Sequence, residues 1–209
     1  MDIQDFDISA FPSLKLIQPS SPELTEDDEA APGKWYLEYY GAVNDATVIP
    51  ISVKTTRTFD EGEGDDYVVL CRSYDGITGV GEPGGDCRSC DMAQWINNDV
   101  GRNTPPPCGE ACVYLVWVVE AEMPAVIRFK TTSLAPAVKM SKLLKLRGMN
   151  TIALELGTRM NEGRGDGGEK YRWFVPVFKI AKGISIPSDS EMLGHIGAKA
   201  ALPSGEEEA

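Results

Sequence analysis

The five cysteines of this 209-residue sequence have spacings that predict a metal site; they are Cys71, Cys87, Cys90, Cys108 and Cys112. A two-residue gap, as in Cys87-x-x-Cys90, lets one tight turn present two sulfur atoms, and thiolates bind Zn²⁺ in tetrahedral geometry. Four thiolates leave no coordination position for water, so the zinc is expected to be structural.

The fourth ligand is either Cys71 or Cys112. Cys71 ends a predicted strand where a Cys-rich segment begins, whereas Cys112 starts an apolar strand and can pack as a small hydrophobic residue. We favour the set Cys71, Cys87, Cys90 and Cys108; unligated cysteines or a disulfide are the alternative. Because residues 73–111 have little apolar content, a metal would supply the free energy that burial cannot.

Cationic and aromatic residues are interleaved in several predicted strands. Single-stranded nucleic acid binds to cationic grooves in which aromatic side chains stack on bases. The sequence candidates for such contacts are Arg57, Phe59, Arg72, Arg128, Lys130, Arg164, Lys170, Tyr171, Arg172 and Trp173. Tyr171 and Trp173 would share one face of a strand. Core packing is the alternative for each aromatic residue; we assign Trp117 to the core and expect Trp95 to cover the metal module.

The sequence disfavours catalysis. The single histidine, His195, would have to serve any Ser–His or Cys–His site alone, and it lies in a Gly/Ala-rich stretch. A metal-dependent nuclease could use acidic clusters such as Asp65-Asp66, but no spacing singles out a carboxylate pair. We therefore expect a protein that is not an enzyme.

The formal charge of −12, from 20 Lys+Arg and 32 Asp+Glu, argues against nucleic acid when taken over the whole chain. By position, however, it is −7 over residues 1–32, −9 over 33–127, +8 over 128–182 and −4 over 183–209. This pattern suits a cationic groove between acidic segments. A solvated basic face is the alternative interpretation.

Hydrophobic periodicity predicts a mainly β protein. Strands are expected at 46–58, 67–72, 112–120, 125–131, 151–160 and 170–180, a helix at 133–147, and a glycine-rich loop at 161–169; short helices are possible near 91–98 and 188–199. Strand 67–72 leads into a Cys-rich zinc-binding insertion at about 71–112. With that insertion placed in the first loop, the other five strands fit an OB-fold-like five-stranded barrel with one helix between strands three and four. Another five-stranded barrel or a sandwich is the alternative.

Composition predicts three parts: an acidic N-terminal arm (1–32), the nucleic-acid-binding domain (33–182) and a flexible acidic tail (183–209). No stretch approaches the roughly 18–20 apolar residues of a membrane span. The acidic N-terminus lacks the basic region and apolar run of a secretory signal, so we expect an intracellular, reducing compartment.

Several short motifs occur in a characteristic order: Pro12-Ser13-Leu14-Lys15, Cys71-Arg72-Ser73, Cys87-x-x-Cys90 and Pro107-Cys108. In this respect the chain resembles a group of small proteins encoded by tailed bacteriophages. The resemblance implies a replication or recombination accessory protein in the host cytoplasm, with a zinc-bearing OB-type domain that coats single-stranded DNA. Cys112 is an extra cysteine in that pattern, which supports Cys71 as the fourth ligand.

The ending Glu206-Glu207-Glu208 resembles the acidic tails of single-stranded DNA-binding proteins but lacks the terminal phenylalanine of the bacterial version. Phage or host replication proteins are the partners that such a tail would bind. The alternative function is a zinc-ribbon adaptor that binds a replication or transcription protein without binding DNA.

Overall fold

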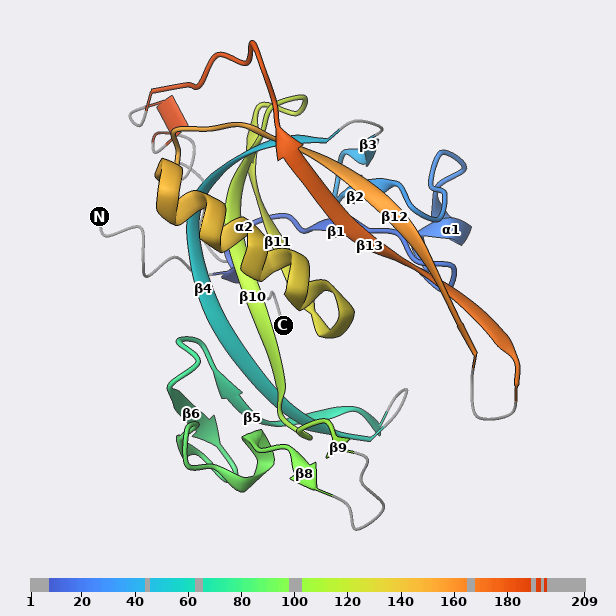
Figure 1. The fold of residues 1–209 in the computed structure, drawn as a ribbon, viewed down its shortest axis with the longest axis vertical. Helices are drawn as coiled ribbons and strands as arrows, with labels where there is room; N and C mark the ends of the chain where they lie inside the picture. The colour runs from blue at the N-terminus through green and yellow to red at the C-terminus, as the bar shows by residue number, and fades with distance from the viewer. Residues whose placement is uncertain are drawn as a thin grey trace, which may run out of the picture. The chain divides into compact units, whose positions relative to one another are not determined.

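The computed structural model describes residues 8–43, 46–62, 66–97, 103–164, 168–188, 191–192 and 194. It is mainly β, with antiparallel sheets and one main helix, as predicted (Figure 1). The elements are η2 (Ile8–Ala10), β1 (Leu14–Leu16), α1 (Glu23–Glu26), β2 (Trp35–Leu37), β3 (Gly41–Val43), β4 (Thr47–Glu61), β5 (Val68–Ser73), β6 (Thr78–Gly81), β7 (Gly85–Asp86), η4 (Asp91–Ala93), β8 (Ile96–Asn97), β9 (Asn103–Thr104), β10 (Gly109–Val118), β11 (Met123–Lys130), η5 (Thr131–Ser133), α2 (Leu134–Arg147), β12 (Leu154–Arg164) and β13 (Lys170–Ile180). Within the described ranges, no helix is long and apolar enough to cross a membrane.

The chain forms two compact units. Unit 1 comprises Met1–Ser52, Tyr114–Ile127 and Ala135–Ala209, and unit 2 comprises Val53–Val113 and Arg128–Leu134. Strands β4, β10 and β11 contribute residues to both units, whereas β5 to β9 belong to unit 2 and β12 and β13 to unit 1.

Strand β4 has two partners along one edge, which explains how it accommodates a proline. Thr47 and Val48 pair with β12, and the stretch from Arg57 to Glu61 pairs with β5. Pro50 lies between these two ladders, so its missing N–H removes no hydrogen bond from either of them. Its carbonyl accepts a hydrogen bond from the Asn150 amide at 2.7 Å. The gap between the two ladders thus accommodates the proline without a bulge between paired strands.

The core of unit 1 is built on β10 and α2. Residues 114–118 of β10 are all buried, as expected for a strand covered on both faces. The Tyr114 hydroxyl donates to the Ala137 carbonyl at 3.1 Å, so α2 packs against β10. The helix ends at Gly148 (φ 94°), whose N–H bonds the Leu144 carbonyl, as a glycine after a helix C-terminus commonly does.

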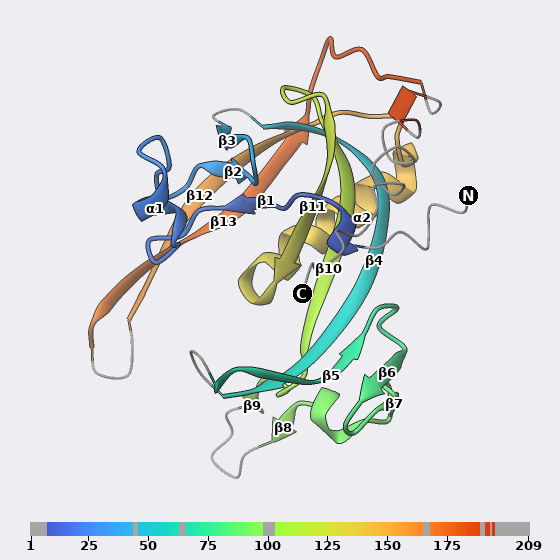
Figure 2. The same ribbon diagram turned by 180° about the vertical axis from the view of Figure 1, so that it is seen from behind.

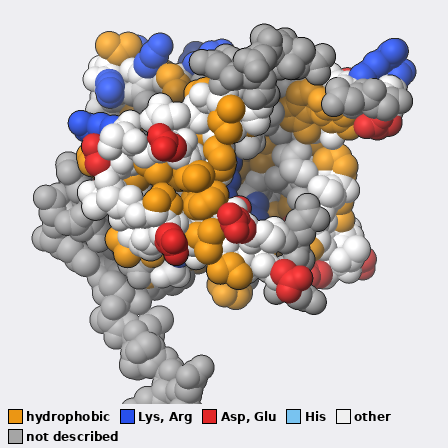
Figure 3. Space-filling view, turned by 90° about the horizontal axis from the view of Figure 1, so that it is seen from below, with side chains coloured by type: hydrophobic (Ala, Val, Ile, Leu, Met, Phe, Trp, Pro, Cys, Tyr) orange, Lys and Arg blue, Asp and Glu red, His pale blue; other side chains and the backbone are white. Residues whose placement is uncertain are grey.

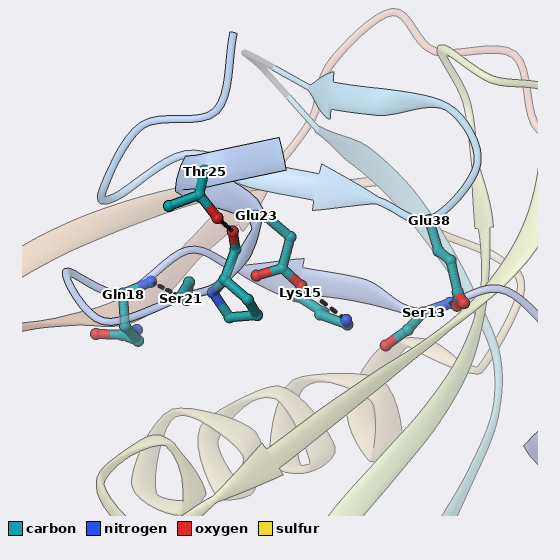
Figure 4. Close-up of polar contacts among 8 residues, drawn as sticks. Ser13, Lys15, Gln18, Ser21, Glu23, Thr25 and Glu38 are labelled. Atoms are coloured by element: carbon teal, nitrogen blue, oxygen red, sulfur yellow. Dashed lines mark hydrogen bonds and ion pairs between the residues drawn. The ribbon is translucent and has the colours of Figure 1, made fainter. Parts of the chain in front are cut away.

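The N-terminal arm packs into unit 1 through buried residues and polar contacts (Figure 4). Strand β1 pairs with β2, and Leu14 and Ile17 are each 1% exposed. The Ser13 amide donates to Glu38 Oε2 at 2.9 Å, and Lys15 Nζ donates to Glu23 Oε1 at 2.8 Å. Part of the predicted N-terminal arm therefore belongs to a three-stranded sheet, β1-β2-β3, whose strands the sequence pattern missed.

Strands β12 and β13 form a long hairpin that projects beyond the other elements of unit 1 (Figures 1 and 2). The register runs from Leu154↔Ile180 to Arg164↔Lys170. The predicted loop at 161–169 was therefore wrong for residues 161–164, which continue the strand because each has a partner in β13. Residues 165–167 lie outside the described part of the chain.

The arm also bridges the two outer strands of unit 1. In the described residues β11 pairs only with β10, and β13 only with β12, so no ladder closes a barrel between them. At one side the Val126 amide of β11 donates to the Pro12 carbonyl at 2.8 Å. At the other side the Gln18 side-chain amide donates to the Phe174 carbonyl of β13 at 3.0 Å and accepts from the Phe174 amide at 2.9 Å. The Gln18 side chain thus makes the two hydrogen bonds to Phe174 that the backbone of a neighbouring strand would make.

Candidate functional site

The four cysteines of the favoured ligand set belong to unit 2, one within a strand and three at element boundaries. Cys71 is in β5 opposite Gly81, Cys87 follows β7, Cys90 precedes η4, and Cys108 precedes β10. Cys71, Cys87 and Cys108 are buried, and Cys90 is half-buried. None of the five forms a disulfide.

The Cys108 thiol lies within electrostatic range of the other three. Burial raises the pKa of the Cys108 thiol; Arg57 lowers it, and Cys87, Cys71 and Cys90 raise it further. Yet no three or more His, Cys, Asp or Glu side chains of the described residues are arranged to hold a metal ion. The four thiols are thus neighbours without a closed tetrahedron, and the zinc site stays a prediction.

The backbone around Cys71 is shaped to bring strands close to its sulfur. A Cβ added at Gly79 would lie 2.9 Å from Cys71 Sγ, so only glycine lets β6 pass this close. The amide of Cys87 donates to the Ile77 carbonyl at 2.8 Å, and that of Cys108 donates to the Met92 carbonyl at 2.8 Å. A soft, thiol-only donor set in a tightly packed turn fits Zn²⁺ better than a hard cation.

The second feature is an aromatic pair on the β12–β13 hairpin of unit 1. The rings of Tyr171 and Trp173 stack with centroids 5.2 Å apart and planes 24° apart. Tyr171 is 50% exposed and Trp173 is half-buried. The Trp173 indole N–H is buried without a hydrogen-bond partner. One ring of this pair therefore remains open to a ligand, and we call Tyr171 and Trp173 the stacking pair.

Gly163 makes room for the stacking pair. It lies opposite Tyr171 in the ladder, and a Cβ at this position would stand 2.7 Å from Tyr171 Cζ and 3.1 Å from Trp173 Cζ3. Aromatic rings that lie over a strand glycine are a known means of covering its exposed backbone. From the sequence, Gly163 was expected to lie in a loop. Continuing the strand pairing symmetrically toward the turn would have placed it opposite Tyr171.

Exposed cations lie along the same hairpin as the stacking pair. Arg164 and Lys170, the last pair of the ladder, are both exposed and project to the opposite face from Tyr171 and Trp173. Arg159, further along β12, is exposed on the same face as the rings, and sequence reasoning missed it. Arg172 donates through Nε to Glu162 Oε1 at 2.7 Å, in an exposed ion pair. Arg172 is thus already paired with a carboxylate, while Arg159, Arg164 and Lys170 are better placed to meet an anionic ligand.

The other five nucleic-acid candidates lie in unit 2. Arg57 forms an ion pair with Glu110, and its side chain is only 20% exposed. Phe59 is half-buried opposite Cys71, so its ring serves the interior of the unit.

The remaining unit 2 candidates face solvent. Arg72 is exposed, with its guanidinium 5.9 Å from the Tyr74 ring centroid. Arg128 and Lys130 are exposed on either side of Phe129, which is 1% exposed, as the predicted alternation requires. The ten candidates are therefore divided equally between the two units.

The remaining sequence predictions concern two tryptophans and several residues outside the described part of the chain. Trp117 is 6% exposed, which confirms its place in the core. Trp95 is 60% exposed, and its expected role in covering the metal module, rather than stacking on a base, stays a prediction. His195, Asp65 and the Glu206–Glu208 run lie outside the described residues.

Comparison with known proteins adds no relative: no family model, no curated protein and no solved structure matches the chain.

Proposed function

We propose that this chain binds single-stranded DNA without sequence preference and is not an enzyme. The observation that carries the proposal is the stacking pair of Tyr171 and Trp173, held over Gly163 on a hairpin that also exposes cations. Bases stack on aromatic faces with about 1–3 kcal/mol each, whatever their identity. Cations beside such a pair bind the phosphates that connect stacked bases.

The topology supports an OB-type barrel as the scaffold. Strands β4, β10 and β11, helix α2, and strands β12 and β13 follow one another in the order of that fold, and β4 pairs with both β10 and β12. In our interpretation the arm takes the place of the missing β11–β13 ladder. The β12–β13 hairpin then corresponds to one of the two loops with which OB-folds bind oligonucleotides.

A structural zinc on Cys71, Cys87, Cys90 and Cys108 is the second part of the proposal. The metal would cross-link turns that bury few apolar residues. The resemblance to tailed-phage proteins supports a role in phage DNA replication or recombination in the host cytoplasm, where thiols stay reduced and available to zinc. Phage or host replication proteins would be the protein partners.

Titration with a fluorescent oligo-dT strand tests DNA binding. We expect binding at low salt that weakens steeply as salt rises, because phosphate contacts release counterions. Tyr171→Ala and Trp173→Ala should each weaken binding by about tenfold, since each loses a stacking surface. Tyr39→Ala is the matched control, because Tyr39 is 91% exposed but lies outside the hairpin. Absence of binding at low salt, or salt-independent binding, would contradict the proposal.

An adaptor function is the second candidate, and the exposed surface of unit 2 favours it. Among the described residues, nine of the seventeen exposed large hydrophobic side chains belong to this unit, including Val80 (67%) and Trp95 (60%). Figure 3 shows a face on which hydrophobic side chains gather with acidic side chains between them. Such surfaces often bind proteins. A pull-down from infected-host lysate, repeated with nuclease, distinguishes the functions: an adaptor keeps its partner and shows no oligonucleotide affinity.

A further inference from the structure

All the charged side chains of helix α2 are positive, and no acidic side chain in the helix compensates them. Its later turns contain Lys139, Lys142, Lys145 and Arg147, all exposed, and the helix contains no acidic residue. Like charges three residues apart on a helix repel each other. The negative end of the helix dipole offsets only the cations of the last turn. The outer face of α2 is therefore suited to an anionic ligand.

The same face exposes apolar side chains. Val138 is 53% exposed and Leu146 is 84% exposed. With Lys142 they lie at four-residue steps, in one line along the helix, opposite the buried Ala137, Met140 and Leu144. A fitting ligand would combine carboxylates with small apolar side chains.

The chain itself contains such a segment, and it starts close to this face. Figures 1 and 2 agree that the helical turn at residues 191–192, drawn red, lies beside the C-terminal end of α2. Met192 is 2% exposed, so this point is anchored in unit 1. The sequence after residue 194 includes Leu202 and the acidic run Glu206–Glu208.

Length and local concentration both allow docking within one chain. Fifteen extended residues reach about 50 Å, whereas α2 is about 21 Å long. A tether of this kind holds its ligand at about millimolar local concentration, so a few exposed ion pairs are sufficient. We propose that the outer face of α2 is the docking site of the chain's own C-terminal segment, residues 195–209. This proposal does not depend on DNA binding.

A competition experiment tests the proposal with a fluorescein-labelled peptide of residues 195–209 and anisotropy as the readout. The wild-type chain should bind the peptide at least about tenfold more weakly than the full-length E206Q/E207Q/E208Q variant, whose own segment competes poorly. Lys142→Glu in that variant should remove binding. Lys182→Glu, at an exposed lysine outside α2, should leave it unchanged.

Equal peptide affinity of the two chains, or equal effects of Lys142→Glu and Lys182→Glu, would overturn the proposal. Light scattering tests whether the segment docks instead on α2 of a second copy of the chain. A molar mass that rises with concentration in the wild type but not in the E206Q/E207Q/E208Q variant would overturn docking within one chain. Amide shifts at α2 that differ between wild type and this variant would support it.

Discussion

The two units achieve order by different means. Of the thirty-two buried hydrophobic residues among those described, only six belong to unit 2, and three of these six are Cys71, Cys87 and Cys108. Unit 1 holds the remainder, including the fully covered run of β10. Burial of apolar surface is the main favourable term in folding. Unit 1 therefore has a hydrophobic core, whereas unit 2 buries few apolar side chains and would depend on the proposed zinc for its order.

Loss of the thiol cluster should give the largest difference between the units. Cys87→Ser or a strong chelator should unfold unit 2, because structural zinc sites contribute on the order of 10 kcal/mol. Hydrogen exchange should show loss of protection in β5 to β7, with β10 residues 114–118 still protected. Cys112→Ser is the matched control and should retain about one zinc per chain. Unchanged exchange in Cys87→Ser would contradict a metal-dependent unit 2.

Removing the Gln18 amide should have the next largest effect, and in unit 1. Gln18→Leu loses two hydrogen bonds and leaves the Phe174 amide and carbonyl uncovered, which should cost about 2–3 kcal/mol of unfolding free energy. Denaturant unfolding measures this loss. Gln94→Leu is the control: its side chain makes one exposed hydrogen bond, to the Arg88 carbonyl, so less than about 0.5 kcal/mol should be lost. Equal losses would show that the arm does not support unit 1.

Adding one carbon at Gly163 should separate binding from stability. Gly163→Ala pushes the stacking pair off the strand, so affinity for oligo-dT should fall about three- to tenfold while stability changes by about 1 kcal/mol or less. Gly157→Ala in the same strand places its Cβ 3.2 Å from Val177 Cγ2, away from the rings, and should keep wild-type affinity. If both variants bind alike, the stacking pair is not the DNA contact.

Lowering the pH should produce the smallest difference between the two units, at the Asp75 turn of unit 2. The amides of Thr78 and Ile77 and the Ser73 hydroxyl lower the pKa of Asp75 from 3.8 to about 2. Because the folded pKa is the lower one, this stabilisation is complete above the ordinary pKa and is lost as pH falls from about 4 to about 2. Amide exchange at Ile77 and Thr78 should therefore speed up over this range. Asp75→Asn should remove the pH dependence while keeping the turn.

Glu23 of unit 1 provides the contrasting case for the acid experiment. Its pKa is also lowered, mainly by the hydrogen bond from Lys15, so its contribution is lost as pH falls below its ordinary value. Lys15→Met should raise this pKa, whereas removing the Ser73 hydroxyl from Asp75 would leave the larger effect of the Thr78 and Ile77 amides in place. A carboxyl titration by NMR checks both. An unchanged Glu23 pKa in Lys15→Met would contradict the assignment.

Local pattern was sufficient for the main elements. The β-branched run of β4, the apolar run of β10 and the 3.6-residue period of α2 each gave an element at the predicted place, because burial and period act within a few residues. Pairing was harder to predict. The strand from Asn161 to Arg164 looked like a glycine-rich loop, since its stability comes from partners in β13 and not from its own composition.

Composition and spacing are properties of the chain, and they were sufficient to predict the β class, the one main helix, the candidate thiols and the segregation of charge. The fold was needed to show that the Cys108 thiol interacts with Cys71, Cys87 and Cys90, that Gln18 takes the place of a ladder rung on β13, and that Gly163 supports the stacking pair. These are contacts between residues distant along the chain. They depend on register and packing, which a one-dimensional pattern does not encode.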